Sequence, residues 1–359
     1  MQQTLLALKT AKRGAKVLII DPKGDRWKWE QDLYTFRDQV KVTTFTADIK
    51  DKGKLDPFNI MRVGISKENY IERMKEAANW AMDICMFLIA ADRKDPRTNI
   101  LLQAVNRVVN KSNPAMNKII EEIKIIGAEA DKEENIIKKN MCNEIAETLN
   151  SYKQMAYSSL LFGDGDEEAI SLERTVNVLQ IQNLVFPDAE TAPENYTFQE
   201  IVGYACLLAI TGYIMLFIMS DRKELSIFEM DEATVLRATA AGKNISNKII
   251  RMARALQSPG IFISQSIDDI GDSKVLNNIG YKFAFRTSDD EEIEKTLRAY
   301  GIEPTEENKE ILSSLENGMC LFQDLEGRTG VVAIDAVFEE YINAFKTGAE
   351  DKEENEEVS

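Results

Sequence analysis

Short apolar runs that end in polar loops predict a largely parallel sheet with helices packed against it. The first run, residues 17–20, is uninterrupted, as is typical of a strand buried on both faces. It follows a helical pattern at residues 2–13 and leads into the loop 21–25, at the strand's carboxyl end, where open α/β sheets bind ligands. Further strands are predicted at 226–230, 261–264, 281–285, 319–323 and 331–334, with helices at 246–256 and 339–346.

Between residues 66 and 157 the apolar positions follow a helical period instead. Long helices are expected at 68–92, 96–111, 115–130 and 134–157, with no convincing strand between them. We therefore predict an all-helical insertion at residues 66–157 that divides one α/β domain into two parts, residues 1–65 and 158–347. Residues 348–359 are expected to form an acidic, disordered tail, because residues 350–357 hold six acids and one lysine.

One stretch is apolar enough to raise the question of a membrane. Residues 201–220 contain no charged side chain, and twenty residues are enough for a helix to span a bilayer. The flanking residues show no clear positive bias, which a spanning helix commonly has. A helix buried on all sides within an α/β core has the same composition. The sequence favours the core helix, with a membrane span as the alternative.

Composition limits the available chemistry. The 359 residues include 44 Lys+Arg, 60 Asp+Glu and no histidine, for a net charge of −16. The absence of histidine excludes Ser-His-Asp and Cys-His nucleophiles and every imidazole metal ligand. The four cysteines lie far apart without zinc or redox spacing, which favours a reducing cytosol. The acidic balance argues against a broad surface that coats nucleic acid.

The most informative motif is the strand at residues 226–230, which is followed by Asp231-Glu232. Two carboxylates at the carboxyl end of a strand suit a nucleotide hydrolase. In such an enzyme the first carboxylate supports the Mg²⁺ shell and the second polarises the attacking water. Taken alone the motif is weak, since Glu229 interrupts the apolar run and a plain loop after a strand is the alternative.

The next two predicted strands end in Gln265 and Arg286. If the three strands are adjacent, their ends offer a metal ligand, an amide that senses a γ-phosphate or its water, and a positive charge for the transition state. Phosphoryl transfer requires this combination of groups, and it requires no histidine.

In the order and spacing of several motifs, the chain resembles the motor domain of conjugative type IV secretion ATPases of the VirB/TraC/TrbE type. The resemblance covers nearly the whole chain. Its motifs are VLIIDPKGD at 17–25, GKLDPF at 53–58, MDEA at 230–233, RMARA at 251–255, ISQS at 263–266, NNIGYKFAFR at 277–286 and GR at 327–328.

The resemblance implies an α/β fold of the RecA-like P-loop NTPase kind, with a mostly parallel central sheet and a helical insertion. It implies ATP and Mg²⁺ as cofactors and a ring of identical subunits, a hexamer in the family. The family works in the cytoplasm, peripherally at the cytoplasmic face of the membrane, with other conjugation-channel proteins as partners. Nucleic acid is a further partner of the family's machinery, although the acidic composition gives it no direct support.

The resemblance also assigns roles to carboxylate and amide side chains. Asp231 matches the Walker B aspartate that supports Mg²⁺, and Glu232 matches the glutamate that activates water. Gln265 matches the glutamine that contacts the γ-phosphate. Asp25 stands where the family often has an acidic residue near the nucleotide.

Among the arginines, Arg254 matches the residue that related ring motors place across a subunit interface. Arg251 and Arg286 are weaker candidates for the same role, in which they would contact the nucleotide. For each of these arginines, an ordinary surface ion pair is the alternative interpretation.

One family motif is missing from the sequence. The chain contains no G-x-x-x-x-G-K-[ST], the loop whose backbone N–H groups and lysine hold the phosphates. In the family this loop stands just before the helix that matches residues 2–13. The resemblance therefore predicts a motor subunit truncated at its amino end, without the first strand and phosphate loop, and weak or inactive alone. A non-catalytic scaffold subunit of the same machinery is the alternative.

Overall fold

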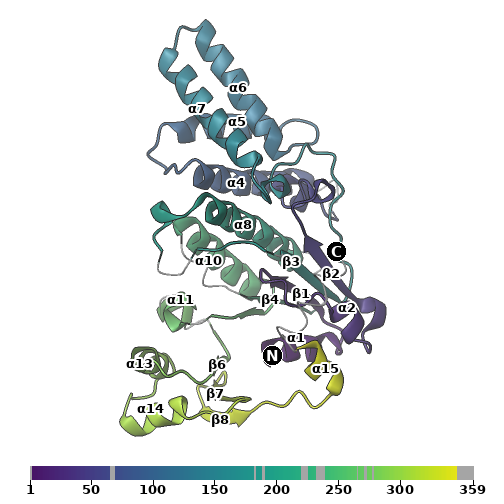
Figure 1. Ribbon diagram of the computed structural model, residues 1–359, viewed down its shortest axis with the longest axis vertical. Coiled ribbons are helices and arrows are strands. Elements are labelled where there is room, and N and C mark those ends of the chain that lie inside the picture. The colour runs from purple at the N-terminus through teal and green to yellow at the C-terminus, as the bar shows by residue number, and fades with distance from the viewer. Residues whose placement is uncertain are drawn as a thin grey trace, which may run out of the picture.

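The structure is a computed structural model that describes residues 2–64, 69–181, 183–187, 191–219, 225–231, 239–264, 266–270, 273–276 and 279–345. The two halves of its central sheet come from either side of the predicted insertion. Five parallel strands lie in the order β2-β3-β1-β4-β5 (Figure 1). These strands are β1 (Lys16–Asp21), β2 (Val40–Phe45), β3 (Val176–Ile181), β4 (Ser226–Met230) and β5 (Gly260–Phe262).

The alternation along β1 explains why both faces of this sheet are covered. Leu18 and Ile20 belong to one hydrophobic cluster, and Val17 and Ile19 belong to another on the opposite face. Because successive strand residues point to opposite faces, an uninterrupted apolar run needs a packed layer on each side. The predicted fold class, α/β with a mostly parallel central sheet, is confirmed. The sequence patterns did not predict β2 or β3.

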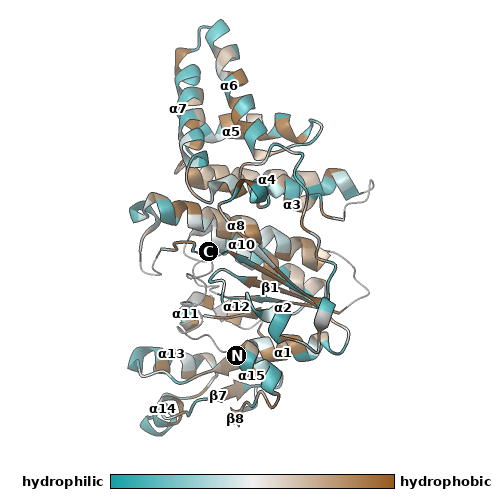
Figure 2. Cartoon of the chain, turned by 45° about the vertical axis from the view of Figure 1, so that its right-hand side comes forward, coloured by the Kyte–Doolittle hydropathy of each residue, from teal (hydrophilic) through white to brown (hydrophobic). Residues whose placement is uncertain are grey.

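On one face the sheet packs against α8 (Phe198–Met219), whose residues are almost all buried. This helix is long and apolar enough to cross a membrane, but 94% of its most apolar window is buried inside the fold. Figure 2 shows its hydrophobic colouring in the middle of the molecule, beside the strands. The burial agrees with the interpretation as a core helix. Helices α3 (Pro57–Met61), α4 (Tyr70–Leu88) and α10 (Ala240–Ala255) all contact α8.

The other face is covered by α1 (Gln2–Ala11), α2 (Trp29–Asp32) and α15 (Glu339–Ala344), which join the two ends of the described chain. Helix α15 is fastened to α2 and to the residues that follow it. The Trp29 indole N–H donates to the Ala344 carbonyl (3.0 Å), and Thr35 donates its backbone N–H and hydroxyl to Glu340. The Lys12 ammonium lies 5.1–5.7 Å from the ring centroids of Phe36, Phe338 and Tyr341.

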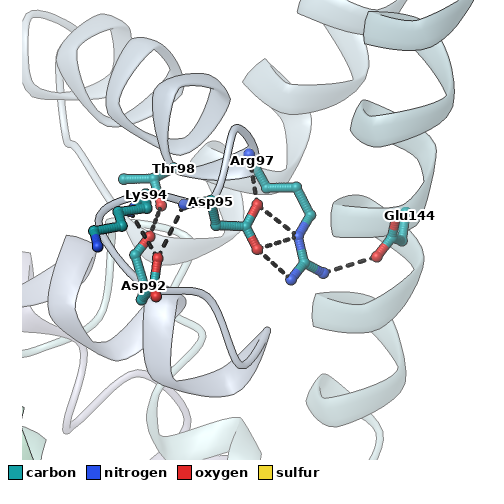
Figure 3. Close-up of polar contacts among 6 residues, drawn as sticks. All are labelled: Asp92, Lys94, Asp95, Arg97, Thr98 and Glu144. Atoms are coloured by element: carbon teal, nitrogen blue, oxygen red, sulfur yellow. Dashed lines mark hydrogen bonds and ion pairs between the residues drawn. The ribbon is translucent and has the colours of Figure 1, made fainter.

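Within residues 69–157 every element is helical: α4, α5 (Arg97–Val109), α6 (Met116–Lys132) and α7 (Ile136–Lys153), with a short 3₁₀ turn from Ser158 after them. The start of α5 is organised by side chains (Figure 3). Asp92 accepts the N–H groups of Lys94 and Asp95, and the Arg97 guanidinium forms a bidentate contact with Asp95 and reaches Glu144 on α7. Helices α5, α6 and α7 project at one end of the molecule, and α4 lies between them and α8 (Figure 1). The domain boundaries at 65/66 and 157/158 stay a prediction.

A fully buried aspartate ties this helical region to the sheet. The Asp56 carboxylate accepts the N–H groups of Phe58 (2.9 Å), Met116 (2.7 Å) and Gly163 (3.1 Å). It therefore caps α3 and holds the start of α6 and the returning chain at one point. Burial raises the pKa of Asp56 to about 7, although the N–H groups of Met116 and Phe58 and nearby Arg62 act in the opposite direction.

The last strands form a sheet of their own. β6 (Lys282–Ala284), β7 (Met319–Gln323) and β8 (Thr329–Ala333) are antiparallel, in the order β6-β7-β8. Helices α13 (Asp290–Ala299) and α14 (Glu306–Ser313) form a separate small core with Leu321 of β7. The short helices α11 (Ile267–Ile270) and α12 (Ser273–Leu276) lie between β5 and β6 in the chain. The tail at 348–359 lies outside the described residues.

The four cysteines, Cys85, Cys142, Cys206 and Cys320, are all free and buried.

Candidate active site at the strand ends

The candidate site lies where β1 and β4 end side by side. The two strands pair in parallel, so their carboxyl ends meet at one edge of the sheet, with Ile20 opposite Met230. The Asp231 N–H continues the pairing by donating to the Ile20 carbonyl (3.2 Å). Helix α1 packs against β4, and Thr4 in its first turns donates its hydroxyl to Glu229 (3.1 Å). The strand ends and the start of α1 therefore meet at this edge.

The centre of this edge is a buried ion cluster around Arg26. Its Nη2 donates to Glu229 Oε1 (2.7 Å), while its Nη1 lies 3.2 Å from Asp21 Oδ1 and 3.5 Å from Asp231 Oδ2. The Trp29 ring lies 5.4 Å from the guanidinium carbon. The side chains of Asp21 and Glu229 are fully buried, and that of Asp231 is 22% exposed. Asp231 is thus the member of the cluster that solvent, or a ligand, reaches most easily.

The Asp21 carboxylate also determines the shape of the loop after β1. Asp21 accepts the N–H groups of Gly24 (3.1 Å) and Arg26 (3.0 Å), so the chain turns around its side chain. Gly24 has φ +75°, a conformation in which a residue without Cβ is favoured. This turn places the Arg26 side chain back over the strand ends. The D-P-K-G-D-R sequence therefore forms a loop that is held by the Asp21 side chain and carries a buried cation.

Burial dominates the electrostatics of the two innermost carboxylates. It raises the pKa of Asp21 and of Glu229, and the attraction of Arg26 only partly opposes it. For Arg26 burial acts to lower the pKa, but the attractions of Glu229, Asp21 and Asp231 outweigh it and the pKa is raised. The guanidinium therefore stays charged. The second oxygen of Glu229, Oε2, is buried and has no hydrogen-bond partner among the described residues.

A magnesium ion fits this edge through Asp231. Mg²⁺ prefers oxygen ligands and usually keeps several waters, with one or two carboxylates and substrate phosphates completing its shell. The partly exposed Asp231 carboxylate at the strand end can serve in this way. Across the described ranges, no group of three or more His, Cys, Asp or Glu residues is arranged to hold a metal ion by itself.

The structure tests the sequence-based site only in part. Glu232 and Gln265 lie outside the described residues. Asp231 is at the strand end, as predicted, while Asp25 is an exposed residue of the loop after β1 and makes none of the cluster contacts. Asp21 and Arg26, on either side of Asp25, are the residues of that loop that reach the strand ends.

The predicted arginines are not brought to this edge. Arg251 and Arg254 are exposed in the last turns of α10, which starts after β4 and ends before β5. Because α10 returns the chain to the amino ends of the parallel strands, these residues lie at the opposite edge of the sheet from Asp231. Arg251 donates to the Asn247 carbonyl of its own helix (3.2 Å).

The expectation of three adjacent strand ends is wrong for the third strand. β4 and β5 are neighbours, but β6 pairs with β7 in the antiparallel sheet, so Arg286 follows a strand of a different sheet. The apolar run at residues 281–285 correctly predicted a strand, which is β6. The choice of partner depended on the hydrogen bonds that β7 offered, which a local pattern does not contain.

Sequence reasoning missed the cluster of Asp21, Arg26 and Glu229. Glu229 appeared only as an interruption of an apolar strand. A charged residue within a buried strand needs a partner, and an arginine in the loop after another strand was the signal that could have been followed.

Comparison with known proteins identifies a family, a relative and a similar structure for this chain. The AAA-like domain family matches residues 1–345. The chain is 28% identical over 346 residues to the uncharacterized protein YddE of Bacillus subtilis (strain 168), covering 92% of this chain and 39% of that protein. Its fold is similar to the structure of VirB4 of Thermoanaerobacter pseudethanolicus, with a TM-score of 0.68, 15% identity, and coverage of 95% of this chain and 87% of that one. The chain thus spans well under half of its Bacillus relative.

These matches support the expected likeness to a type IV secretion ATPase at the level of family and fold. With the family matched over nearly its whole length and the parallel sheet ending in Asp231 beside β1, the chain belongs to the AAA-like domain family.

Proposed function

We propose that this chain is the ATP-binding and ATP-hydrolysing motor subunit of a conjugative type IV secretion system that transfers DNA. The observation that carries the proposal is the partly exposed Asp231 carboxylate at the end of β4, in an AAA-like domain, beside the loop after β1. The likeness of the fold to VirB4 of T. pseudethanolicus supports the same class of machine.

In this proposal the strand-end carboxylates serve phosphoryl transfer. Asp231 supports Mg²⁺, which neutralises charge on the phosphates when bound. Glu232 orients and activates the attacking water, and Gln265 contacts the γ-phosphate. Asp25 is exposed in the loop beside the cluster, within the part of the site that nucleotide would approach.

The arginines act between subunits of a ring, which we propose to be a hexamer. Arg254 lies at the edge of the sheet opposite Asp231, a placement that suits contact with a neighbouring subunit's nucleotide rather than with its own. Arg251 is a weaker candidate for the same contact. Arg286 is proposed to contact nucleotide only through rearrangement or a neighbour, since it follows β6 in the second sheet.

The working location that follows from this proposal is the cytoplasm, at the cytoplasmic face of the membrane, with other conjugation-channel proteins as partners. Nucleic acid would be handled by the assembled machine, since the net charge of −16 gives this chain no broad basic surface.

ATP hydrolysis tests the proposal. Residues 1–359 contain no G-x-x-x-x-G-K-[ST], so we expect the purified chain to hydrolyse ATP slowly. A version joined at its amino end to a segment that carries such a loop, here called the loop-bearing protein, should hydrolyse ATP faster. Glu232→Gln should abolish that gain, whereas Glu326→Gln, in the turn between β7 and β8, should preserve it. Rapid hydrolysis by residues 1–359 alone would contradict the need for the loop.

The alternative function is a non-catalytic scaffold subunit that keeps the fold for its contacts in the same machinery. Isothermal titration of the loop-bearing protein with a slowly hydrolysed ATP analogue separates the two. The motor predicts Mg²⁺-dependent binding that Asp231→Asn weakens, and the scaffold predicts no Mg²⁺-dependent binding at all.

A further inference from the structure

Arg26 is an unusual residue for the interior of a protein. Its side chain is only 10% exposed, and within 3.5 Å it meets carboxylates from three places in the chain: Asp21, Glu229 and Asp231. Taking an ion pair out of water costs several kcal/mol per ion, so a buried cluster is weak support for stability as such. A hydrophobic residue of similar size would cover Trp29 equally well. The cluster therefore calls for an explanation other than packing.

The contacts of Arg26 are graded from buried to exposed. The shortest distance is to Glu229 (2.7 Å) and the next is to Asp21 (3.2 Å), and both of these side chains are fully buried. The longest is to Asp231 (3.5 Å), whose side chain is 22% exposed. Glu229 and Asp21 thus hold the guanidinium in place. Its third contact is with Asp231, the only partly exposed carboxylate of these three.

The anchors are themselves fixed. Glu229 Oε1 also accepts the Thr4 hydroxyl from α1, and Asp21 accepts two N–H groups of its own loop. The Trp29 ring lies against the guanidinium, and its indole is bonded to Ala344 of α15. Arg26 therefore occupies a position determined by β1, β4, α1 and α2 together, before any ligand binds.

We propose that Arg26 is a positioning residue that holds the Asp231 carboxylate in the orientation needed to support a magnesium ion bound with nucleotide. This inference rests on the proposed ATPase function. Arg26 is 10% exposed and contacts Asp231 Oδ2, while the Asp231 side chain is 22% exposed. Glu229 serves as the anchor for Arg26, which explains a buried glutamate next to the last residue of β4.

The proposal depends on the fork shape of arginine. Its guanidinium reaches several carboxylates at once, whereas a lysine ammonium is a compact charge that cannot bridge the same set. Without the guanidinium, Asp231 would lose this counter-charge while it still faced Asp21 and Glu229, and the like charges would push its carboxylate away from the strand end.

The first test needs no nucleotide and uses residues 1–359. The urea midpoint is measured for Asp231→Asn in the wild-type and Arg26→Met backgrounds. If Arg26 holds Asp231, the asparagine lowers the midpoint in the wild type and raises it in Arg26→Met, where it relieves repulsion. An identical shift in both backgrounds overturns the proposal. If Arg26→Met does not fold, Glu229→Gln and Arg26→Met/Glu229→Gln provide the two backgrounds, since removing both partners of a buried pair is tolerated better.

The second test measures ATP hydrolysis by the loop-bearing protein as Mg²⁺ is varied. Arg26→Met should raise the Mg²⁺ concentration for half-maximal rate about tenfold, because it removes the ion pair that holds Asp231, and Arg26→Lys should recover only part of the loss. Arg62→Met is the matched control, because Arg62 bonds the Gly165 and Pro114 carbonyls away from the strand ends. It should reduce stability without moving the Mg²⁺ dependence.

The outcomes separate the two ideas. If Arg26→Met and Arg62→Met lower the rate alike and neither changes the Mg²⁺ dependence, Arg26 is structural only and the proposal fails. If the loop-bearing wild type does not hydrolyse ATP, the proposed function fails, while the unfolding comparison still decides whether Arg26 holds Asp231.

Discussion

Among single residues, the most informative are the ionisable side chains that the fold has buried. Arg26 and Glu229 form one buried pair at the strand ends, and Asp56 stands alone among backbone donors at the junction with the helical region. A buried charge without a counter-charge is costly, and Asp56 has only N–H groups in direct contact. Its pKa is therefore raised by burial, to about 7.

This raised pKa predicts a pH dependence of stability. Between about pH 4 and 7 the folded protein keeps the Asp56 proton that the unfolded chain has lost, so the free energy of unfolding falls as pH rises through that window. Asp56→Asn does not titrate. The difference in unfolding free energy between wild type and Asp56→Asn should fall from pH 5 to pH 7, by at most about 1.4 kcal/mol per pH unit, and then level off. Urea unfolding at pH 5, 6, 7 and 8 measures it. A difference that grows with pH would mean that the N–H donors outweigh burial.

Gly53, beside the same junction, predicts a second residue-level effect. It has φ +68°, and a Cβ there would lie 2.8 Å from the Gly163 Cα. Gly301 has φ +74° with nothing within 4 Å. Gly301→Ala should therefore cost about 1 kcal/mol from backbone strain alone, and Gly53→Ala about 2–4 kcal/mol, because a steric clash adds to the strain. Equal losses of unfolding free energy in the two variants would contradict the close approach of residues 53 and 163.

At the scale of elements, α8 shows that the composition of a helix does not determine whether it lies in a membrane or in a protein core. Its sequence would suit a lipid bilayer, yet it lies between the sheet and helices α3, α4 and α10, which cover it on several sides. Its polar groups find partners within the fold: the Thr211 hydroxyl donates to the Leu208 carbonyl, and the Tyr213 hydroxyl donates to the Lys54 carbonyl. A helix buried in this way has no apolar face left for lipid.

This burial predicts the behaviour of the chain in membrane fractionation. Residues 1–359, expressed alone, should be released from membranes by a carbonate wash, because α8 is packed inside the fold. The measurement is an immunoblot of the washed pellet and the supernatant. Retention in the pellet after the wash would support the membrane-span alternative for residues 201–220 instead.

At the scale of the whole molecule, the end of the described chain completes the layer that its start begins. Tyr341 and Ala344 of α15 pack in one cluster with Leu5 and Leu8 of α1 and with Trp29 of α2. Helix α15 (Glu339–Ala344) follows the antiparallel sheet in the chain and packs on the face of the central sheet that carries α1 (Figure 1). It therefore connects the two sheets, and we call it the strap. The strap also contacts Trp29, which lies against Arg26.

Removing the strap should weaken the whole domain. A variant that ends at residue 338 uncovers the apolar surface around Trp29 and should lose at least about 3 kcal/mol of unfolding free energy, as expected when a buried aromatic side chain is removed. A variant that ends at Phe345 keeps every described contact of α15 and serves as the control. Urea unfolding and hydrogen exchange in α1 and α2 measure the effect. Equal stability of the two variants would show that α15 is not needed to cover this face.

Much of the fold could be predicted from local patterns. The uninterrupted run before Asp21 and the apolar run before Asp231 correctly indicated β1 and β4, because strands buried on both faces need apolar side chains throughout. The four long helices of residues 69–157 followed from their period. In contrast, β3 escaped prediction because it buries Asn177 and Gln180, whose side chains bond the Arg174 carbonyl and the Thr44 hydroxyl. In a sequence pattern, polar residues indicate an exposed segment unless their hydrogen-bond partners are known.

The sequence by itself determined the α/β class, the helical region, and the carboxylate at the end of β4, since each depends on neighbouring residues along the chain. Only the tertiary structure decided which strand ends share an edge, which side of the sheet Arg254 occupies, and that β6 joins another sheet. It alone brought Arg26 to Glu229 across 203 positions of sequence. The physical reason is that a buried charge is stable only beside its partners, and contacts between distant segments exist only in the folded chain.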